Sequence, residues 1–94
     1  MEEKAKKIAE LLRLLANEHR LLILCALRKG PLTVGELRRF TPHISASALS
    51  QHLNQLRTAG ILASEKQGMN VIYRIQDQRA AALLEAIREY YCGD

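Results

Sequence analysis

Apolar residues recur near both ends of the chain at the spacing of helices that bury one face. Within residues 3–16 these positions are Ile8, Leu11, Leu12 and Leu15. After Asp77, a good helix N-cap, the same spacing is made by Ala80, Leu83, Leu84, Ile87 and Tyr91. The pattern predicts one helix at each end of the chain, each carrying an apolar stripe.

Two more helices are predicted from the first half of the interior. The stretch Leu21–Leu27 is apolar on nearly every side, so a helix opened by Asn17 and stopped at Gly30 should lie at the centre of the fold. Thr33 and Glu36 have the spacing of a capping box, which predicts a short third helix running through residue 40.

The second half of the interior predicts a turn, a helix and a hairpin. Residues 41–44 contain a proline and should form a turn, after which Ser45 caps a fourth helix that ends at Gly60. Apolar stretches at 61–64 and 71–75, joined by a polar connection, predict a β-hairpin. The expected fold is mainly α with a small β-hairpin, a winged helix-turn-helix with additional N- and C-terminal helices.

Composition agrees with this fold class, because hydrophobic residues make up 48% of the chain and aromatic residues only 4%. A chain of 94 residues is too short for two separate cores, so residues 1–94 are expected to form a single domain. No signal peptide and no apolar run of about 18 residues is recognisable, which predicts a soluble, cytoplasmic protein.

The charge distribution indicates a polyanionic partner. The net charge is +4, and from Glu18 to Arg74 eight basic residues stand against three acidic ones. The fourth helix presents a face without charge, and amide and hydroxyl groups of this kind can hydrogen-bond base edges. We therefore predict double-stranded DNA as the partner, with a neutral solvent-facing surface as the alternative interpretation.

The predicted DNA contacts fall into two groups. The polar residues of the fourth helix expected to face the bases are Ser45, Ser47, Ser50, Gln51, Asn54 and Gln55. Those expected to contact phosphates, or DNA beside the hairpin, are Arg38, Arg39, Arg57, Lys66, Gln67, Asn70 and Arg74. Phosphate contacts supply affinity and register, whereas base contacts supply specificity.

The residue runs 15–24, 32–37, 45–53 and 71–73 together resemble the ArsR/SmtB family of bacterial winged-helix repressors. The resemblance implies a homodimer, built from the first and last helices, that binds an imperfect inverted repeat and is controlled by an effector. The corresponding interface residues are Ile8, Leu11, Leu12, Leu15, Leu83, Leu84, Ile87 and Tyr91.

Metal sites known in that family lack their ligands in this sequence. The third helix carries Val34 and Gly35 where soft-metal sensors have a cysteine pair, and Tyr90 stands where a zinc site in the last helix would need histidine. The three histidines are scattered over separate elements, and His52 is expected to form hydrogen bonds beside the core. We therefore expect no metal and no other cofactor.

The two cysteines, Cys25 and Cys92, are compatible with either buried structural thiols or a redox switch. Nearby cations, Arg28 for Cys25 and Arg88 for Cys92, favour reactive thiolates. The positions also resemble those of the HlyU, BigR, SqrR and YgaV branch of the family, which senses reactive sulfur species and oxidants. That resemblance implies a disulfide or polysulfide bridge between the two thiols that weakens operator binding.

Three other functions would make different demands on the sequence. A thiol enzyme would need a base beside a cysteine and a substrate cleft, and the sequence predicts neither, so no catalytic residue is expected. A winged helix that binds only proteins is distinguished by salt dependence, which is steep for DNA binding. The remaining alternative is a DNA-binding regulator with structural cysteines and another effector.

Overall fold

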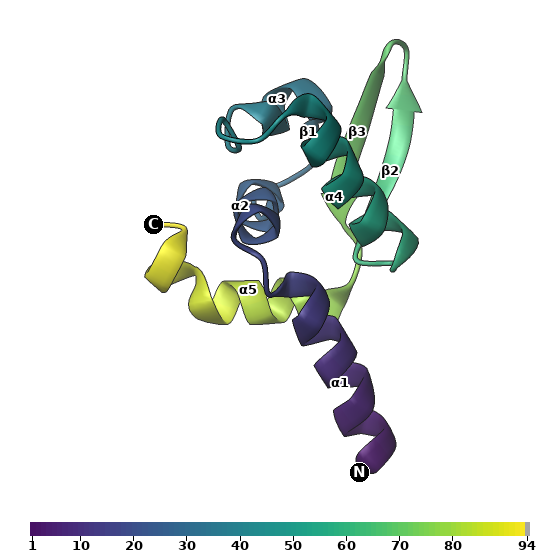
Figure 1. Ribbon diagram of the computed structural model, residues 1–94, viewed down its shortest axis with the longest axis vertical. Helices are drawn as coiled ribbons and strands as arrows, with labels where there is room; N and C mark the ends of the chain where they lie inside the picture. Colours follow the sequence, from purple (N-terminus) through teal and green to yellow (C-terminus); the bar gives the residue numbers. More distant parts are fainter. Residues whose placement is uncertain (94) are drawn as a thin grey trace.

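The computed structural model describes residues 1–93 and confirms a mainly helical fold with a small antiparallel sheet (Figure 1). The elements are, in chain order, α1 (Glu2–Leu15), α2 (Glu18–Leu27), β1 (Leu32–Thr33), α3 (Val34–Arg38), α4 (Ala46–Thr58), β2 (Leu62–Gln67), β3 (Asn70–Ile75) and α5 (Gln78–Tyr91). Among these helices, none is both long enough and apolar enough to cross a membrane.

Polar side chains fix where four of the helices begin. Asn17, Ser45 and Asp77 each accept hydrogen bonds from backbone N–H groups in the first turn of α2, α4 and α5. At α3, Thr33 and Glu36 form the predicted capping box, with each side chain accepting from the other residue's backbone. These caps satisfy N–H groups that have no partner inside the helix.

The third helix is shorter than predicted. It ends at Arg38 instead of residue 40, because the following residues form tighter turns in which each N–H donates to the carbonyl three residues back. Phe40, for example, donates to Leu37 at 3.0 Å. The chain therefore enters the turn before α4 two residues earlier than the sequence pattern predicts.

The hairpin is longer and its tip tighter than predicted. Gln67 pairs with Asn70, so Gly68 and Met69 alone form the tip, and Gly68 adopts a φ of +63° that glycine accepts without strain. The strand β1 was not predicted; it adds a third strand with the order β1-β3-β2. A two-residue strand is too short to give an alternating pattern.

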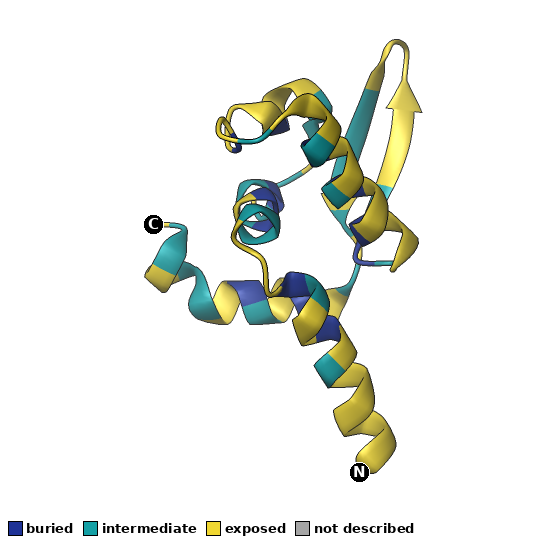
Figure 2. Cartoon of the chain, viewed as in Figure 1, coloured by how far each residue is buried: buried dark blue, intermediate teal, exposed yellow. Residues whose placement is uncertain are grey.

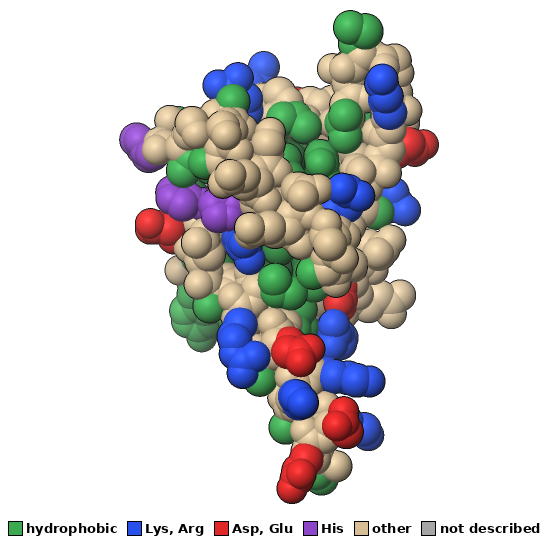
Figure 3. Space-filling view, turned by 45° about the vertical axis from the view of Figure 1, so that its right-hand side comes forward, with side chains coloured by type: hydrophobic (Ala, Val, Ile, Leu, Met, Phe, Trp, Pro, Cys, Tyr) green, Lys and Arg blue, Asp and Glu red, His purple; other side chains and the backbone are tan. Residues whose placement is uncertain are grey.

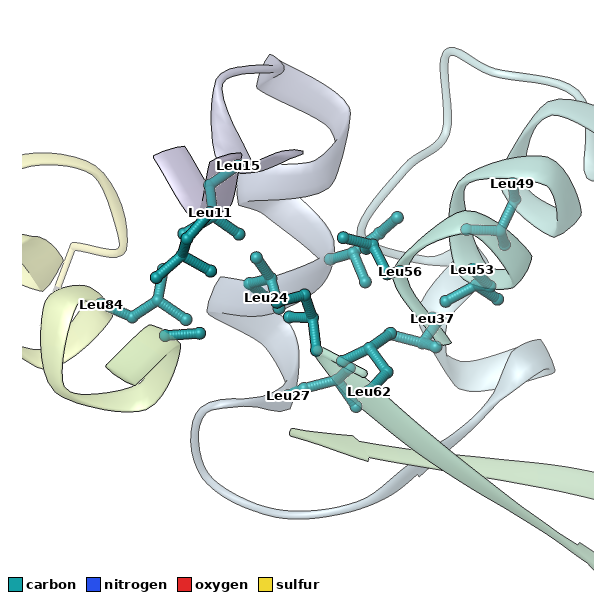
Figure 4. Packing of buried hydrophobic residues seen from close by; sticks show 13 residues of the cluster. Leu11, Leu15, Leu24, Leu27, Leu37, Leu49, Leu53, Leu56, Leu62 and Leu84 are labelled. Atoms are coloured by element: carbon teal, nitrogen blue, oxygen red, sulfur yellow. The ribbon is translucent and has the colours of Figure 1, made fainter. Parts of the chain in front are cut away.

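The core is centred on α2, as predicted. Ile23 and Leu24 are fully buried, and Leu24 lies between the helices at the two ends of the chain and the buried face of α4 (Figure 4). On one side it faces Leu11 and Leu84, and on the other it faces Leu56. This packing joins α1, α4 and α5 to a common central helix.

The first half of α1 extends away from this core and is exposed on almost all sides (Figure 2). Ile8 is 43% exposed and Leu12 46% exposed, whereas Leu11 and Leu15 are buried by the rest of the same chain. The single chain therefore leaves an apolar surface on α1 uncovered.

Candidate nucleic-acid interface and thiol pair

The helix α4 lies at the surface beside the hairpin, with its two faces divided as the sequence predicts (Figure 1). Leu49, Leu53 and Leu56 are buried in the core. The opposite side is open to solvent, and the predicted base-facing residues are all exposed: Ser45, Ser47, Ser50, Gln51, Asn54 and Gln55. This arrangement leaves the uncharged face of α4 accessible to a large partner.

The turn that orients α4 is anchored by one buried polar side chain. Thr41 is 3% exposed, and its hydroxyl donates to the carbonyl of Leu37 at 3.4 Å. Ser45 then caps α4, since its hydroxyl accepts from the Ala48 N–H at 3.0 Å. The Ser45 side chain is thus engaged in starting the helix, and its remaining hydrogen-bonding capacity is its hydroxyl proton and one oxygen lone pair.

Two amide side chains on α4 are bonded to arginines. The Oδ1 atom of Asn54 accepts from Nη2 of Arg57 at 2.7 Å, within the same helix. The Oε1 atom of Gln55 accepts from Nη2 of Arg20, which belongs to α2. Both carbonyl oxygens therefore have donors within the protein.

Arg20 holds together three elements. Besides Gln55, its Nε atom donates to Nδ1 of His52 at 3.1 Å, and its Nη1 atom donates to the carbonyl of Leu14 at the end of α1 at 3.0 Å. The expected hydrogen-bonding role of His52 is confirmed. The sequence does not reveal this role of Arg20, because its partners on α4 lie 32 and 35 positions away.

A histidine pair accompanies this arginine. The ring centroids of His19 and His52 are 5.9 Å apart. Burial, followed by electrostatic interactions with Arg20 and His19, lowers the pKa of His52 below its usual value. His52 is therefore uncharged at neutral pH, which suits the acceptor role of its Nδ1 atom.

Basic side chains stand around the α4 face and on the hairpin. Figure 3 shows Lys and Arg side chains at the edges of a largely uncharged surface and along the projecting hairpin. The predicted phosphate-side contacts are all exposed: Arg38, Arg39, Arg57, Lys66, Gln67, Asn70 and Arg74. Arg74 stands apart from α4, because it lines a hollow at the base of the hairpin with residues of α2 and α5.

The two cysteines meet although 67 positions separate them in the sequence. Cys25 in α2 and Cys92 at the end of α5 form a disulfide, with Cα atoms 5.7 Å apart. That separation lies within the range of about 7 Å that a direct bridge requires. The pair links the central helix to the last helix, and both residues are partly accessible.

The two arginines predicted to favour thiolates, Arg28 and Arg88, interact with different groups. The positive charge of Arg28 acts on the Tyr91 hydroxyl and lowers its pKa, opposing the larger effect of burial, which raises it. Arg28 thus interacts with the residue that directly precedes Cys92. Arg88 is bonded to Glu85 at 2.6 Å, which compensates part of the positive charge expected beside Cys92.

The described part of the chain contains no group of three or more histidine, cysteine or acidic side chains placed to hold a metal ion. Asp77, the carboxylate at the start of the last helix, caps α5 and pairs with Arg79 at 2.7 Å. The Arg79 hydrogen bond, together with backbone N–H groups of α5, keeps the pKa of Asp77 below its usual value despite partial burial. The Asp77 carboxylate is therefore already bonded to the first turn of α5.

Of the predicted interface residues, three belong to the core. Leu11, Leu15 and Leu84 are 4%, 3% and 1% exposed in the single chain, so nearly all of their surface is already buried within one copy. The residues that keep exposed apolar surface are Ile8, Leu12, Leu83, Ile87 and Tyr91. Tyr90, which is 86% exposed, adds to that surface and was not among the predicted interface residues.

The fold and the exposed α4 face define the class of protein, a winged helix-turn-helix transcriptional regulator and not an enzyme. The family model described as "Bacterial regulatory protein, arsR family" matches residues 17–64, which span α2 to the start of the hairpin. The chain belongs to this family.

Similar proteins cover almost the whole chain. The transcriptional activator HlyU of Vibrio cholerae is 40% identical over 98% of this chain and 84% of its own length. A biofilm growth-associated repressor of Agrobacterium fabrum is 38% identical over 99% of this chain and 79% of its own. The structure of the repressor BigR from Xylella fastidiosa superposes with a TM-score of 0.88 at 34% identity, covering 100% of this chain and 95% of its own.

Proposed function

We propose that the protein is a dimeric repressor that binds operator DNA in the cytoplasm and is controlled by oxidation or persulfidation of Cys25 and Cys92. The observation that carries the proposal is the contact between these two cysteines, which joins the helix behind α4 to the last helix. Membership of a family of bacterial regulatory proteins supports a transcriptional output for such a switch.

Operator recognition would use the exposed face of α4 in a major groove. Its amides and hydroxyls match base edges, and the surrounding arginines and the hairpin lysine match phosphates. A dimer would place two such helices about 34 Å apart, which is one turn of DNA, on an imperfect inverted repeat. Affinity should then fall steeply with salt, as phosphate neutralisation requires.

Dimerisation would bury the apolar surface that the single chain leaves open on α1 and α5. Ile8 and Leu12 are nearly half exposed, and Tyr90 is exposed almost fully. Residues of this kind are unfavourable on a small monomer, and a two-fold interface would cover the same surface on both copies. Because Cys92 directly follows α5, one of the two thiols lies at the end of a helix of the proposed interface, and the disulfide connects that helix to Cys25 in α2.

The switch would be a two-electron oxidation. Two thiols lose two protons and two electrons as the S–S bond forms, and a small persulfide accepts them, being converted to a thiol and hydrogen sulfide. A longer polysulfide bridge would retain sulfur from the donor. Either bridge would tie α2 to α5 and bias the spacing of the two α4 helices, and a coupling of about 1 to 3 kcal/mol changes affinity about 5- to 150-fold.

The chemical half of this proposal is tested by mass spectrometry of the reduced protein after treatment with an organic persulfide. We expect a cross-linked peptide pair containing Cys25 and Cys92, with the mass of a disulfide or of added sulfur atoms. Separate adducts on the two cysteines, without a bridge, would contradict the proposed switch.

The DNA-binding half of the proposal is tested by measuring how partner binding changes with salt. A weak salt dependence of that binding would favour a protein-interaction module.

A further inference from the structure

We infer that Arg20 and Arg57 set the hydrogen-bonding polarity of the α4 surface, so that Gln55 and Asn54 offer N–H donors to the bases. The inference deepens the proposed operator recognition and rests on it. It assigns Arg20, on a different helix, as a positioning residue for base specificity, although we do not expect it to touch a base.

The argument starts from the amide group itself. A glutamine or asparagine side chain has a carbonyl oxygen, which accepts, and an NH2 group, which donates. Arginine has only donors, so an amide bonded to arginine must turn its oxygen toward the guanidinium. The oxygens of Gln55 and Asn54 are bonded in this way to Arg20 and Arg57, and the NH2 group of each amide points elsewhere.

The orientation of Gln55 is fixed more firmly than that of Asn54. The Arg20 guanidinium also donates to His52 at 3.1 Å and to the Leu14 carbonyl at 3.0 Å, which holds it in place from α4 and from the end of α1. Arg57 is bonded to Asn54 within the same exposed helix, so this bond does not tie the Asn54 amide to a second element. Gln55 is therefore pre-positioned before DNA arrives.

This orientation selects among the four bases. In the major groove, guanine presents two acceptors, thymine presents one, and cytosine presents a donor. Adenine presents an acceptor beside a donor, which a freely rotating glutamine matches with both of its groups. With its oxygen held by Arg20, Gln55 should favour guanine or thymine, disfavour cytosine and lose the usual advantage of glutamine at adenine.

The experiment is selection of binding sites from a random double-stranded DNA library, followed by sequencing, with the full-length reduced protein. Gln55→Glu identifies the base pair that this side chain faces. It keeps an oxygen for Arg20 but removes the N–H donors, so the preference at that base should move from guanine or thymine to cytosine by about 5- to 150-fold. Arg20→Met should release the amide of Gln55 and shift the same base toward adenine. Arg13→Met, on the exposed side of α1, is the matched control and should leave the preference unchanged.

Two results would overturn the inference while leaving operator recognition intact. The first is a wild-type preference for adenine at that base. The second is an Arg20→Met variant that keeps the wild-type base preference although circular dichroism confirms that it is folded. The Gln55→Glu arm keeps Arg20 in place and so does not depend on that variant's stability. A wild-type protein that enriches no sequence at all would overturn the proposed function itself, and the inference with it.

Discussion

Arg20 and His52 are joined by a hydrogen bond of 3.1 Å from the guanidinium Nε atom to the imidazole Nδ1 atom. The bond fixes the protonation of the ring, because Nδ1 can accept only when it carries no proton, which leaves the proton of the neutral ring on Nε2. It also connects the first turn of α2 to the middle of α4. Any change at His52 therefore acts on the helix proposed to read DNA.

The first prediction is a pH-dependent stability that arises at His52. Its pKa is lowered in the folded state, so below the ordinary value of 6.5 the unfolded chain binds more protons than the folded one. The free energy of unfolding should be fully developed above pH 6.5 and fall as the pH decreases below it. Urea denaturation between pH 5 and 8 measures this slope.

His52→Asn is the matched control, because the asparagine oxygen can accept from Arg20 but does not titrate. The variant should lose the part of the slope that His52 contributes. Equal slopes for wild type and variant would show that His52 does not carry the effect.

The second prediction separates base reading from phosphate contact on the proposed interface. Gln51 is exposed on α4 and has an uncharged amide, so Gln51→Ala should reduce discrimination between operator and random DNA by about 1 to 3 kcal/mol. Lys66, on the hairpin, should contribute to phosphate binding, so Lys66→Ala should weaken binding to both DNAs alike. Titrations on the two DNAs measure this, and equal losses for Gln51→Ala would remove it from base reading.

The third prediction concerns assembly. Sedimentation at micromolar concentration should give a dimer, and Leu12→Glu should convert it to a monomer by placing a charge in the proposed interface. Phe40→Glu is the control, since Phe40 is 48% exposed in the turn after α3 and away from α1 and α5. A wild-type monomer, or a monomer produced equally by both variants, would contradict the assigned surface.

The fourth prediction is indifference to zinc. Asp77 is held by Arg79 and by the start of α5, and the described residues bring no second and third ligand to it. One equivalent of zinc should leave operator affinity unchanged in a titration with reduced protein. A zinc-dependent shift in affinity of tenfold or more would overturn the view that metal is not the effector.

The sequence predicts the helices of this fold well because their signals are local. Asn17, Thr33, Ser45 and Asp77 act on N–H groups within three residues, so each cap is visible in the printed chain. The strand β1 is not visible in this way. Its two residues are held by pairing with Tyr73 and Ile72, which lie some forty positions later.

The candidate site likewise contains features with local sequence signals and features that depend on contacts between distant positions. The exposed face of α4 follows from helical spacing, and it was predicted residue by residue. The bonds from Arg20 to His52 and Gln55 depend on how α2 packs against α4, which no spacing within either helix reveals. Leu11 and Leu84, which the stripes assign to an interface, are already buried in the single chain, because an apolar stripe does not distinguish a chain's own core from an interface.

The central claim is that the Cys25–Cys92 pair controls operator binding. Its most direct test is operator affinity of wild type, Cys25→Ser and Cys92→Ser, each measured before and after treatment with an organic persulfide. We predict that wild type loses affinity about 5- to 150-fold and regains it with reductant, whereas both variants bind like reduced wild type throughout. Unchanged wild-type affinity, with mass spectrometry confirming modification of both cysteines, would contradict the account.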